Sequence, residues 1–225
     1  MSRFRVPTPR NEAVKDYAPG SPEREDLLKA LEELKASPVE IPLVIGGEEI
    51  KTDQQIKITA PHNHDLVLGT YHQGGEKEAR MAVEAALEAQ KTWALMPWEH
   101  RAAIFLKAAE LISGPYRAKV NAATMLSHSK SIYQAEIEAA CELSDFYRFG
   151  AYCMQQIYDI QPINTKGIWN RLDHRPLEGF IFAVTPFNFV AINGNLPAAP
   201  AMMGNVVVWK PASSVAYTSH LLMTI

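Results

Sequence analysis

The chain has 225 residues, of which 47% are hydrophobic and 21% charged, an ordinary globular composition that excludes disorder over most of its length. Its formal charge of -3 comes from interspersed acidic and basic residues, so we expect no nucleic-acid partner. Residues 1–11 lack the apolar core of a secretory signal and no apolar run reaches the roughly 20 residues that cross a bilayer, so we expect no membrane partner and a cytoplasmic location.

The first part of the chain predicts an arm, a helix and a small β-meander. Residues 1–20 are polar and interrupted by prolines, as expected of an arm. Ser21 and Pro22 suit the start of a helix, whose leucines recur at helical spacing until Pro38. Short β-like runs follow from Ile41, and they are Leu43–Ile45, Ile56–Thr59 and Leu66–Tyr71.

Helical periodicity then predicts a mostly α-helical layer. Cys141 and Cys153 both fall inside its last helix, where we expect buried free thiols rather than a disulfide. Glu136 and Glu138 do not share a helix face, so we interpret them as solvated carboxylates. The predicted helices are Glu76–Trp93, Trp98–Ser113, a stretch that runs to Leu126, and Ser131 to about Ile160.

Beyond Pro162 the pattern changes to strands, predicted at Gly167–Leu172, Gly179–Thr185 and Val206–Trp209. The last two are fully apolar, as in buried parallel strands, and a helical crossover at Pro197–Met203 would join them. This is the opening of a doubly wound α/β sheet. Because two parallel strands cannot cover themselves, we expect the domain to be incomplete or to need a partner.

Polar side chains follow both of these strands. Thr185 and Asn188 come after one, and Lys210 ends the other, at the sheet edge where doubly wound folds bind ligands. An asparagine amide on a tight turn suits stabilisation of a developing oxyanion. A lysine there suits ribose hydroxyls or a phosphate. From spacing alone, a loop asparagine that satisfies backbone groups and a solvated lysine explain these residues better.

Two other polar clusters carry weaker signals. His62 and His64 lack a third ligand at useful spacing, so we expect a polar loop and no metal site. Ser127 and His128 are adjacent in the chain, a placement that rarely makes a catalytic pair.

The two strand exits carry a resemblance to a known family. The V-T-P-F-N-F turn at 184–189 and the P-A-x-x-G-N-V-V-V-x-K-P run at 200–211 resemble the aldehyde dehydrogenase superfamily. The resemblance extends over essentially the whole chain to its 1-pyrroline-5-carboxylate dehydrogenase branch. The stretches that are similar to this branch are Gly20–Arg24, Leu111–Pro115, Gln134–Glu138, Glu142–Phe149 and Leu177–Phe180.

This resemblance implies a fold and an activity. The fold would be α/β, the N-terminal part of an aldehyde dehydrogenase: a helical layer plus the first βαβ unit of a doubly wound cofactor-binding sheet. Residues 1–40 would form the arm and short helix, and 41–225 an incomplete NAD-binding domain with an oligomerisation strand at 162–176. The full-length enzyme, a homo-oligomer, would oxidise L-glutamate 5-semialdehyde to L-glutamate with NAD in proline catabolism.

The resemblance also implies roles for matched residues. Asn188 would donate its amide to the reacting oxygen. The catalytic domain, with its nucleophilic Cys and general-base Glu, would lie beyond Ile225, so we expect these 225 residues to be inactive alone. Ser213 stands where many members of the family carry Glu. The binding roles would fall to Thr185, Pro186 and Phe187 at the nicotinamide, Lys210 and Ser213 at the adenosine ribose, and Glu142 and Phe189 at the aldehyde pocket.

Two alternatives stay open. Another member of the superfamily, for example one that acts on succinic semialdehyde, would share both turn motifs, and the segment that reads the substrate carboxylate would lie outside this chain. A non-catalytic binding or assembly module is the alternative from a different class. A reading frame that ends at Ile225 would favour the module, and one that continues for a few hundred codons with a Cys in a Gly-Gln-like turn would favour the enzyme.

Overall fold

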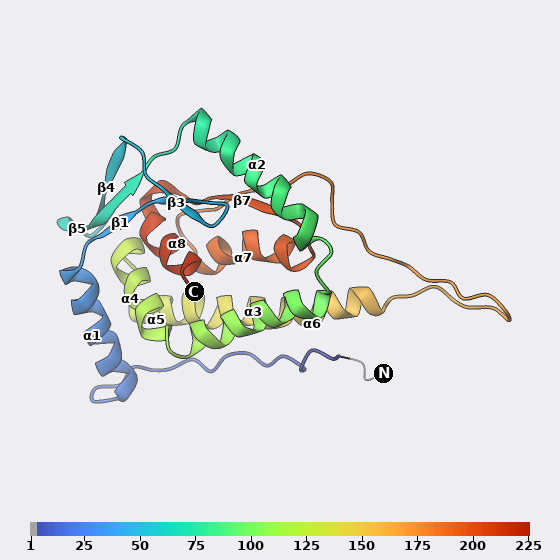
Figure 1. The fold of residues 1–225 in the computed structure, drawn as a ribbon. Helices are drawn as coiled ribbons and strands as arrows, with labels where there is room; N and C mark the ends of the chain where they lie inside the picture. Colours follow the sequence, from blue (N-terminus) through green and yellow to red (C-terminus); the bar gives the residue numbers. More distant parts are fainter. Residues whose placement is uncertain (1–3) are drawn as a thin grey trace.

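Helices make up about half of the structure, a computed structural model that describes residues 4–225 (Figure 1). The helices predicted at Glu76–Trp93 and Trp98–Ser113 are confirmed at both ends. No helix within residues 4–225 is long and apolar enough to cross a membrane. The α-helices are α1 (Pro22–Ala36), α2 (Glu76–Trp93), α3 (Trp98–Ser113), α4 (Arg117–His128), α5 (Ile132–Ala135), α6 (Glu142–Asp159), α7 (Val190–Met202) and α8 (Ala216–Met223).

The predicted helix from Ser131 to Ile160 is not continuous. A π-helical segment, Glu136–Cys141, lies between α5 and α6. It buries Glu136 and Glu138, whose exposed fractions are 0% and 4%, so the prediction of solvated carboxylates was wrong. The reason is that each carboxylate meets a cation from another element, Arg117 for the first and Lys130 for the second. The spacing of residues along one helix does not show which charged residues of other elements will contact them.

The short strands predicted in this region are confirmed, but they form two small sheets rather than one meander, and in one of them the first strand pairs in parallel with the last. Gly46 and Gly47 have φ values of 62° and 87°, the positive values that a tight two-residue hairpin turn requires. This turn joins β2 and β3, and the other sheet has the order β1-β5-β4. The strands are β1 (Val39–Ile41), β2 (Leu43–Ile45), β3 (Glu48–Ile50), β4 (Gln55–Ala60) and β5 (Asn63–His72), of which β1 and β3 were not predicted.

The predicted parallel βαβ unit is also confirmed, but the expectation that its strands are buried was wrong, because Phe182 and Val184 in the first strand are 59% and 53% exposed. Strands β6 (Ile181–Val184) and β7 (Val207–Lys210) pair in parallel, and α7 is the crossover between them. This helix begins earlier than predicted and contains two prolines. Gly194 in its middle allows close packing on α6, because a Cβ there would lie 2.8 Å from Leu143 Cδ1. Helix α7 therefore sits tightly between the pair of strands and the helical layer (Figure 1).

The strand predicted at Gly167–Leu172 was wrong. The backbone there forms only an isolated bridge between Thr165 and Ile168. Its segment extends away from the body as a long excursion between α6 and β6 (Figure 1). Trp169 in this excursion is 79% exposed. The apolar side chains of the excursion therefore have no neighbouring strand within residues 4–225 that would complete a sheet. The oligomerisation strand expected at 162–176 stays a prediction.

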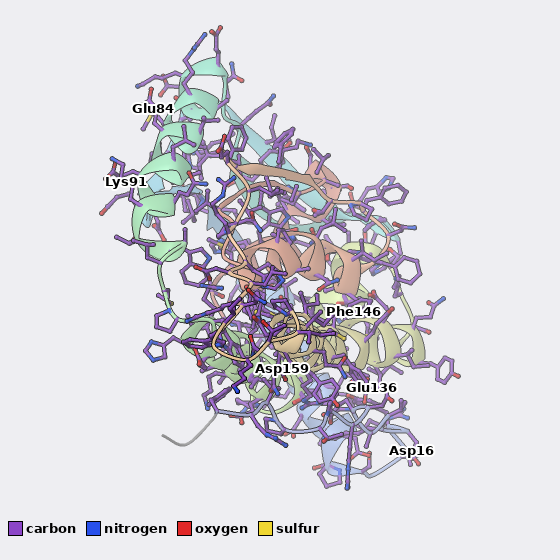
Figure 2. The ribbon with its side chains drawn as sticks, turned by 90° about the vertical axis from the view of Figure 1, so that its right-hand side faces the viewer. Asp16, Glu84, Lys91, Glu136, Phe146 and Asp159 are labelled. Carbon is purple, nitrogen blue, oxygen red and sulfur yellow. The ribbon has the colours of Figure 1, made fainter. Side chains whose placement is uncertain are left out.

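The N-terminal arm lies along the helical layer and is bonded to it. The amide of Val6 donates to Gln155 Oε1 at 2.6 Å, and that of Lys15 donates to Glu136 Oε1 at 2.8 Å. Figure 2 shows Glu136 at the end of the molecule where the arm residue Asp16 also lies. The arm is thereby fixed to helices far along the chain, with Tyr17 buried at 5% exposure in the core between α1 and α4.

Candidate active site at the exits of two parallel strands

The two segments expected to bind ligand leave the sheet at one edge. Val184 pairs with Lys210 at the ends of β6 and β7, and the Thr185 amide donates to the Lys210 carbonyl at 3.2 Å. The side chains of Asn188 and Lys210 are both exposed. The structure thus brings the two predicted exits together, because parallel strands end on the same side of a sheet.

Thr185 holds the turn from inside. Its side chain is 3% exposed, and its hydroxyl donates to Asn193 Oδ1 while accepting from Trp209 Nε1 at 3.0 Å. The Asn193 amide in turn donates to Ser219 Oγ at 2.7 Å. This buried chain ties the turn to α7, β7 and α8. The side chain of Thr185 is therefore engaged within the fold, whereas Phe187 beside it is 64% exposed.

Asn188 presents a free amide at the surface of the turn. Its side chain makes no hydrogen bond to any of residues 4–225, whereas its backbone carbonyl accepts from Lys130 Nζ. An exposed amide with a fixed backbone is the arrangement that suits a donor to a reacting oxygen.

An ion pair beneath this turn was missed from the sequence. Lys130 Nζ lies 2.8 Å from Glu138 Oε1 and 4.2 Å from the centre of the Phe189 ring. Glu138 Oε2 accepts from the amides of Val190 and Ala191 at 2.8 and 3.3 Å, so it caps the start of α7. Nothing in the local spacing of Lys130 and Glu138 predicts that they meet the turn, because the contact is made only by the tertiary fold.

Glu142 belongs to the same charged cluster. It is half-buried in the first turn of α6. Burial raises the pKa of its carboxyl above the usual range, and the charge of Glu138 raises it further, whereas Lys130 acts in the opposite direction. Of the predicted substrate residues, Phe189 therefore lies against Lys130, and the charge of Lys130 also acts on Glu142.

Lys210 and Ser213 offer donors at the neighbouring exit. Both side chains are exposed, and Lys210 Nζ forms no ion pair with any of residues 4–225. Ser213 begins a short 3-10 helix, Ser213–Val215, immediately after the strand. An ammonium group and a hydroxyl that are both free at the carboxyl edge of parallel strands fit the hydroxyls of a nucleotide ribose.

Neither cysteine has the surroundings of a nucleophile. Cys141 is buried, and burial together with the charge of Glu136 raises the pKa of its thiol to about 12. Cys153 is exposed, so the prediction that both thiols are buried was right for Cys141 and wrong for Cys153.

The two thiols should differ sharply in reactivity. Treatment with iodoacetamide at neutral pH should alkylate Cys153 at least about tenfold faster than Cys141, because the attacking species is the thiolate and the Cys141 thiol is both protonated and shielded. Peptide mapping by mass spectrometry measures both rates. Equal rates, or faster labelling of Cys141, would contradict the burial described above.

Other polar features lie away from the strand exits. Within residues 4–225 no group of three metal-ligating side chains converges, and His62 Nδ1 is hydrogen-bonded to Ser129 Oγ at 2.8 Å. One surface hollow lies between the arm, α1 and α4, next to Tyr17, and another lies between α3 and the base of the long excursion, next to Arg101. In this chain the strand exits face outward on an open surface.

Comparisons with known proteins agree with this architecture. The sequence model of the aldehyde dehydrogenase family matches residues 49–225. The delta-1-pyrroline-5-carboxylate dehydrogenase of Agaricus bisporus is 50% identical over 100% of the chain, which covers 42% of that relative. The mitochondrial delta-1-pyrroline-5-carboxylate dehydrogenase of Emericella nidulans is 47% identical over 97% of the chain and 38% of its own length.

Solved structures show the same fold. The crystal structure of the delta-pyrroline-5-carboxylate dehydrogenase from Mycobacterium tuberculosis bound with NAD superposes with a TM-score of 0.97 at 50% identity. The superposition includes 99% of this chain and 42% of the Mycobacterium tuberculosis chain. The fold prediction is confirmed, and the chain spans about two fifths of the length of the relatives that it matches.

Proposed function

The chain belongs to the aldehyde dehydrogenase family, and from this membership we propose that the protein containing it oxidises L-glutamate 5-semialdehyde to L-glutamate with NAD. The aldehyde and water would enter, and the carboxylic acid, NADH and a proton would leave. Whole-chain identity of 50% to a delta-1-pyrroline-5-carboxylate dehydrogenase carries this proposal. The exposed Asn188 amide and Lys210 ammonium on one sheet edge support it.

The residues of this chain would bind and orient. Asn188 would donate its amide to the oxygen of the aldehyde carbon as negative charge develops there. Lys210 and Ser213 would hold ribose hydroxyls, and Pro186 and Phe187, with the backbone of Thr185, would border the nicotinamide. NAD, when bound, supplies the hydride acceptor. Glu142 and Phe189 would border the aldehyde pocket from the side of Lys130.

The nucleophile is proposed to come from residues outside this chain. The Cys141 thiol is buried with a raised pKa, and Cys153 lies near the middle of α6 rather than at the strand exits. A cysteine and a general-base glutamate supplied elsewhere in the protein would complete the reaction.

The assembly and location of the whole protein are also proposals. The excursion at 160–180 exposes apolar side chains, Ile163 at 87% and Trp169 at 79%, which suit pairing with a second subunit in a homo-oligomer. A cytoplasmic location remains the expectation, although the relative from Emericella nidulans is named as mitochondrial.

The activity is tested on the whole protein that contains this chain. NADH formation should be fastest, by kcat/KM, with L-glutamate 5-semialdehyde, and slower with succinic semialdehyde. A preference for succinic semialdehyde would show that the proposed substrate is wrong and that the protein acts on another aldehyde of the family. No NADH formation from either aldehyde would favour the non-catalytic alternative.

Lys210 gives a separate test of the cofactor site. Lys210→Met in the whole protein should weaken NAD binding by about tenfold, the usual effect of losing a hydrogen bond from a charged donor. Titration of NAD against protein fluorescence measures the dissociation constant. Lys77→Met on the exposed side of α2 is the matched control and should leave it unchanged. Equal dissociation constants in both variants would remove Lys210 from the site.

A further inference from the structure

One ion pair, Lys130 with Glu138, contacts the turn that carries Asn188 at two points. Lys130 Nζ donates to the backbone carbonyl of Asn188, which lies just before Phe189. Glu138 accepts from the amides of Val190 and Ala191, just beyond Phe189. The two anchors are joined to each other, because Lys130 and Glu138 lie 2.8 Å apart.

This pair lies in a partly desolvated place. The side chains of Lys130 and Glu138 are 15% and 6% exposed, and the Phe189 ring covers the ammonium at 4.2 Å. Ion pairs that leave water in this way contribute little net stability, since desolvation offsets much of the attraction. Stability alone therefore gives a weak reason for placing a lysine under this turn.

The backbone conformation directly before Lys130 sets the direction of its side chain. Helix α4 ends at His128, and Ser129 directly after it has a φ of 53°, a left-handed conformation that residues other than glycine rarely adopt. Its hydroxyl is hydrogen-bonded to His62 Nδ1 at 2.8 Å, which holds this corner against the turn between β4 and β5. The corner directs Lys130 across to α7 and the strand exit.

We propose that Lys130 is a positioning residue for the Asn188 amide, an inference that rests on the proposed function. Its ammonium fixes the Asn188 carbonyl, and Glu138 fixes the next turn of backbone, so the direction of the Asn188 side chain is set before substrate arrives. Lys130 touches the backbone and ring of the turn and acts on the reaction through Asn188. Because a displacement of about 1 Å in a catalytic group can lower the rate about a hundredfold, this support acts on kcat.

The test is a double-mutant cycle in the whole enzyme. Lys130→Met should lower kcat by roughly tenfold to a hundredfold with little change in KM or in NAD binding. Lys130→Arg, which keeps a cation and donors, should restore most of the loss. In an Asn188→Ala background, Lys130→Met should cause almost no further fall, because the group it positions is already gone. Glu138→Gln should lower kcat in the same direction.

Lys107→Met is the matched control, because Lys107 also contacts a carboxylate, Glu110 at 3.2 Å, but on the exposed face of α3. It should leave kcat unchanged. An equal fractional loss from Lys130→Met with and without Asn188 would overturn the positioning role, as would a loss that follows the thermal midpoint and NAD affinity. If Lys130→Met does not fold, Glu138→Gln takes its place in the cycle. If Asn188→Ala alone leaves kcat unchanged, the proposed function of Asn188 fails first, and this inference fails with it.

Discussion

Asn188→Ala in the whole protein should lower kcat for aldehyde oxidation by about a hundredfold to a thousandfold, the usual loss when one preorganised donor to an oxyanion is removed. KM for the aldehyde should change little, because the donor acts most strongly on the charge that develops in the transition state. The structure supports this result with an exposed amide whose backbone is held from below.

The measurement is steady-state NADH formation at saturating NAD. Asn195→Ala is the matched control, because Asn195 lies in α7 and its side chain makes no hydrogen bond within residues 4–225. It should retain the kcat of the unsubstituted protein. A rise in KM at unchanged kcat in Asn188→Ala would show uniform substrate binding instead of oxyanion stabilisation.

Arg117→Met should lower the free energy of unfolding by about 3–5 kcal/mol, because it leaves the Glu136 carboxylate buried without its cation. Arg117 is 5% exposed, and its guanidinium contacts both oxygens of Glu136 and also Glu12 at 2.7 Å. Glu136 is fully buried and also accepts from Tyr17 and Asn121, each at 2.8 Å. These bonds join the arm to α4 and the π-helical segment.

Urea unfolding with a two-state analysis measures this loss where unfolding is reversible. Arg80→Met is the control, since Arg80 pairs with Glu76 at 2.6 Å with both side chains more than 70% exposed. Such a surface pair should contribute less than about 1 kcal/mol. A loss from Arg117→Met no larger than that of Arg80→Met would show that the buried network tolerates the missing cation.

The same pair gives the stability a defined pH dependence. Burial alone would raise the pKa of Glu136, but bonds from Arg117, Lys15 and Tyr17 bring it below its ordinary value of 4.5. Since the folded pKa is depressed, the contribution is fully present above about pH 4.5 and is lost as the pH falls through the folded value. Glu136→Gln should therefore show a shallower loss of stability in acid than the unsubstituted protein.

Local chemistry explains which elements the sequence predicted well. Helices α2 and α3 begin and end where Gly75, Pro97 and Gly114 interrupt strong periodicity, so propensity and tertiary packing agree. The Gly46-Gly47 hairpin was predictable for the same reason. The two parallel strands were predictable because both are apolar throughout, although the burial that this pattern indicates is not reached within residues 4–225, where Phe182 is 59% exposed.

The errors arose where distant residues decide the outcome. Glu136 and Glu138 were interpreted as solvated because their cations lie on other elements, Arg117 on α4 and Lys130 beyond its end. The strand expected at 167–172 has β-propensity but no neighbour within residues 4–225. The strand pattern predicted that Asn188 and Lys210 follow two neighbouring strands, and their binding roles came only from the resemblance. Lys130 was not predicted, because only the fold brings it to the turn.

The docked arm has a consequence for the order of events during synthesis. Val6 and Lys15 bond to Gln155 and Glu136, residues that leave the ribosome long after them. The arm must therefore wait as unfolded chain until the helices that it docks on have been made, and closing such long loops is slow. A nascent chain arrested before α6 should leave the arm open to proteases, and release of α6 should be the step that protects it.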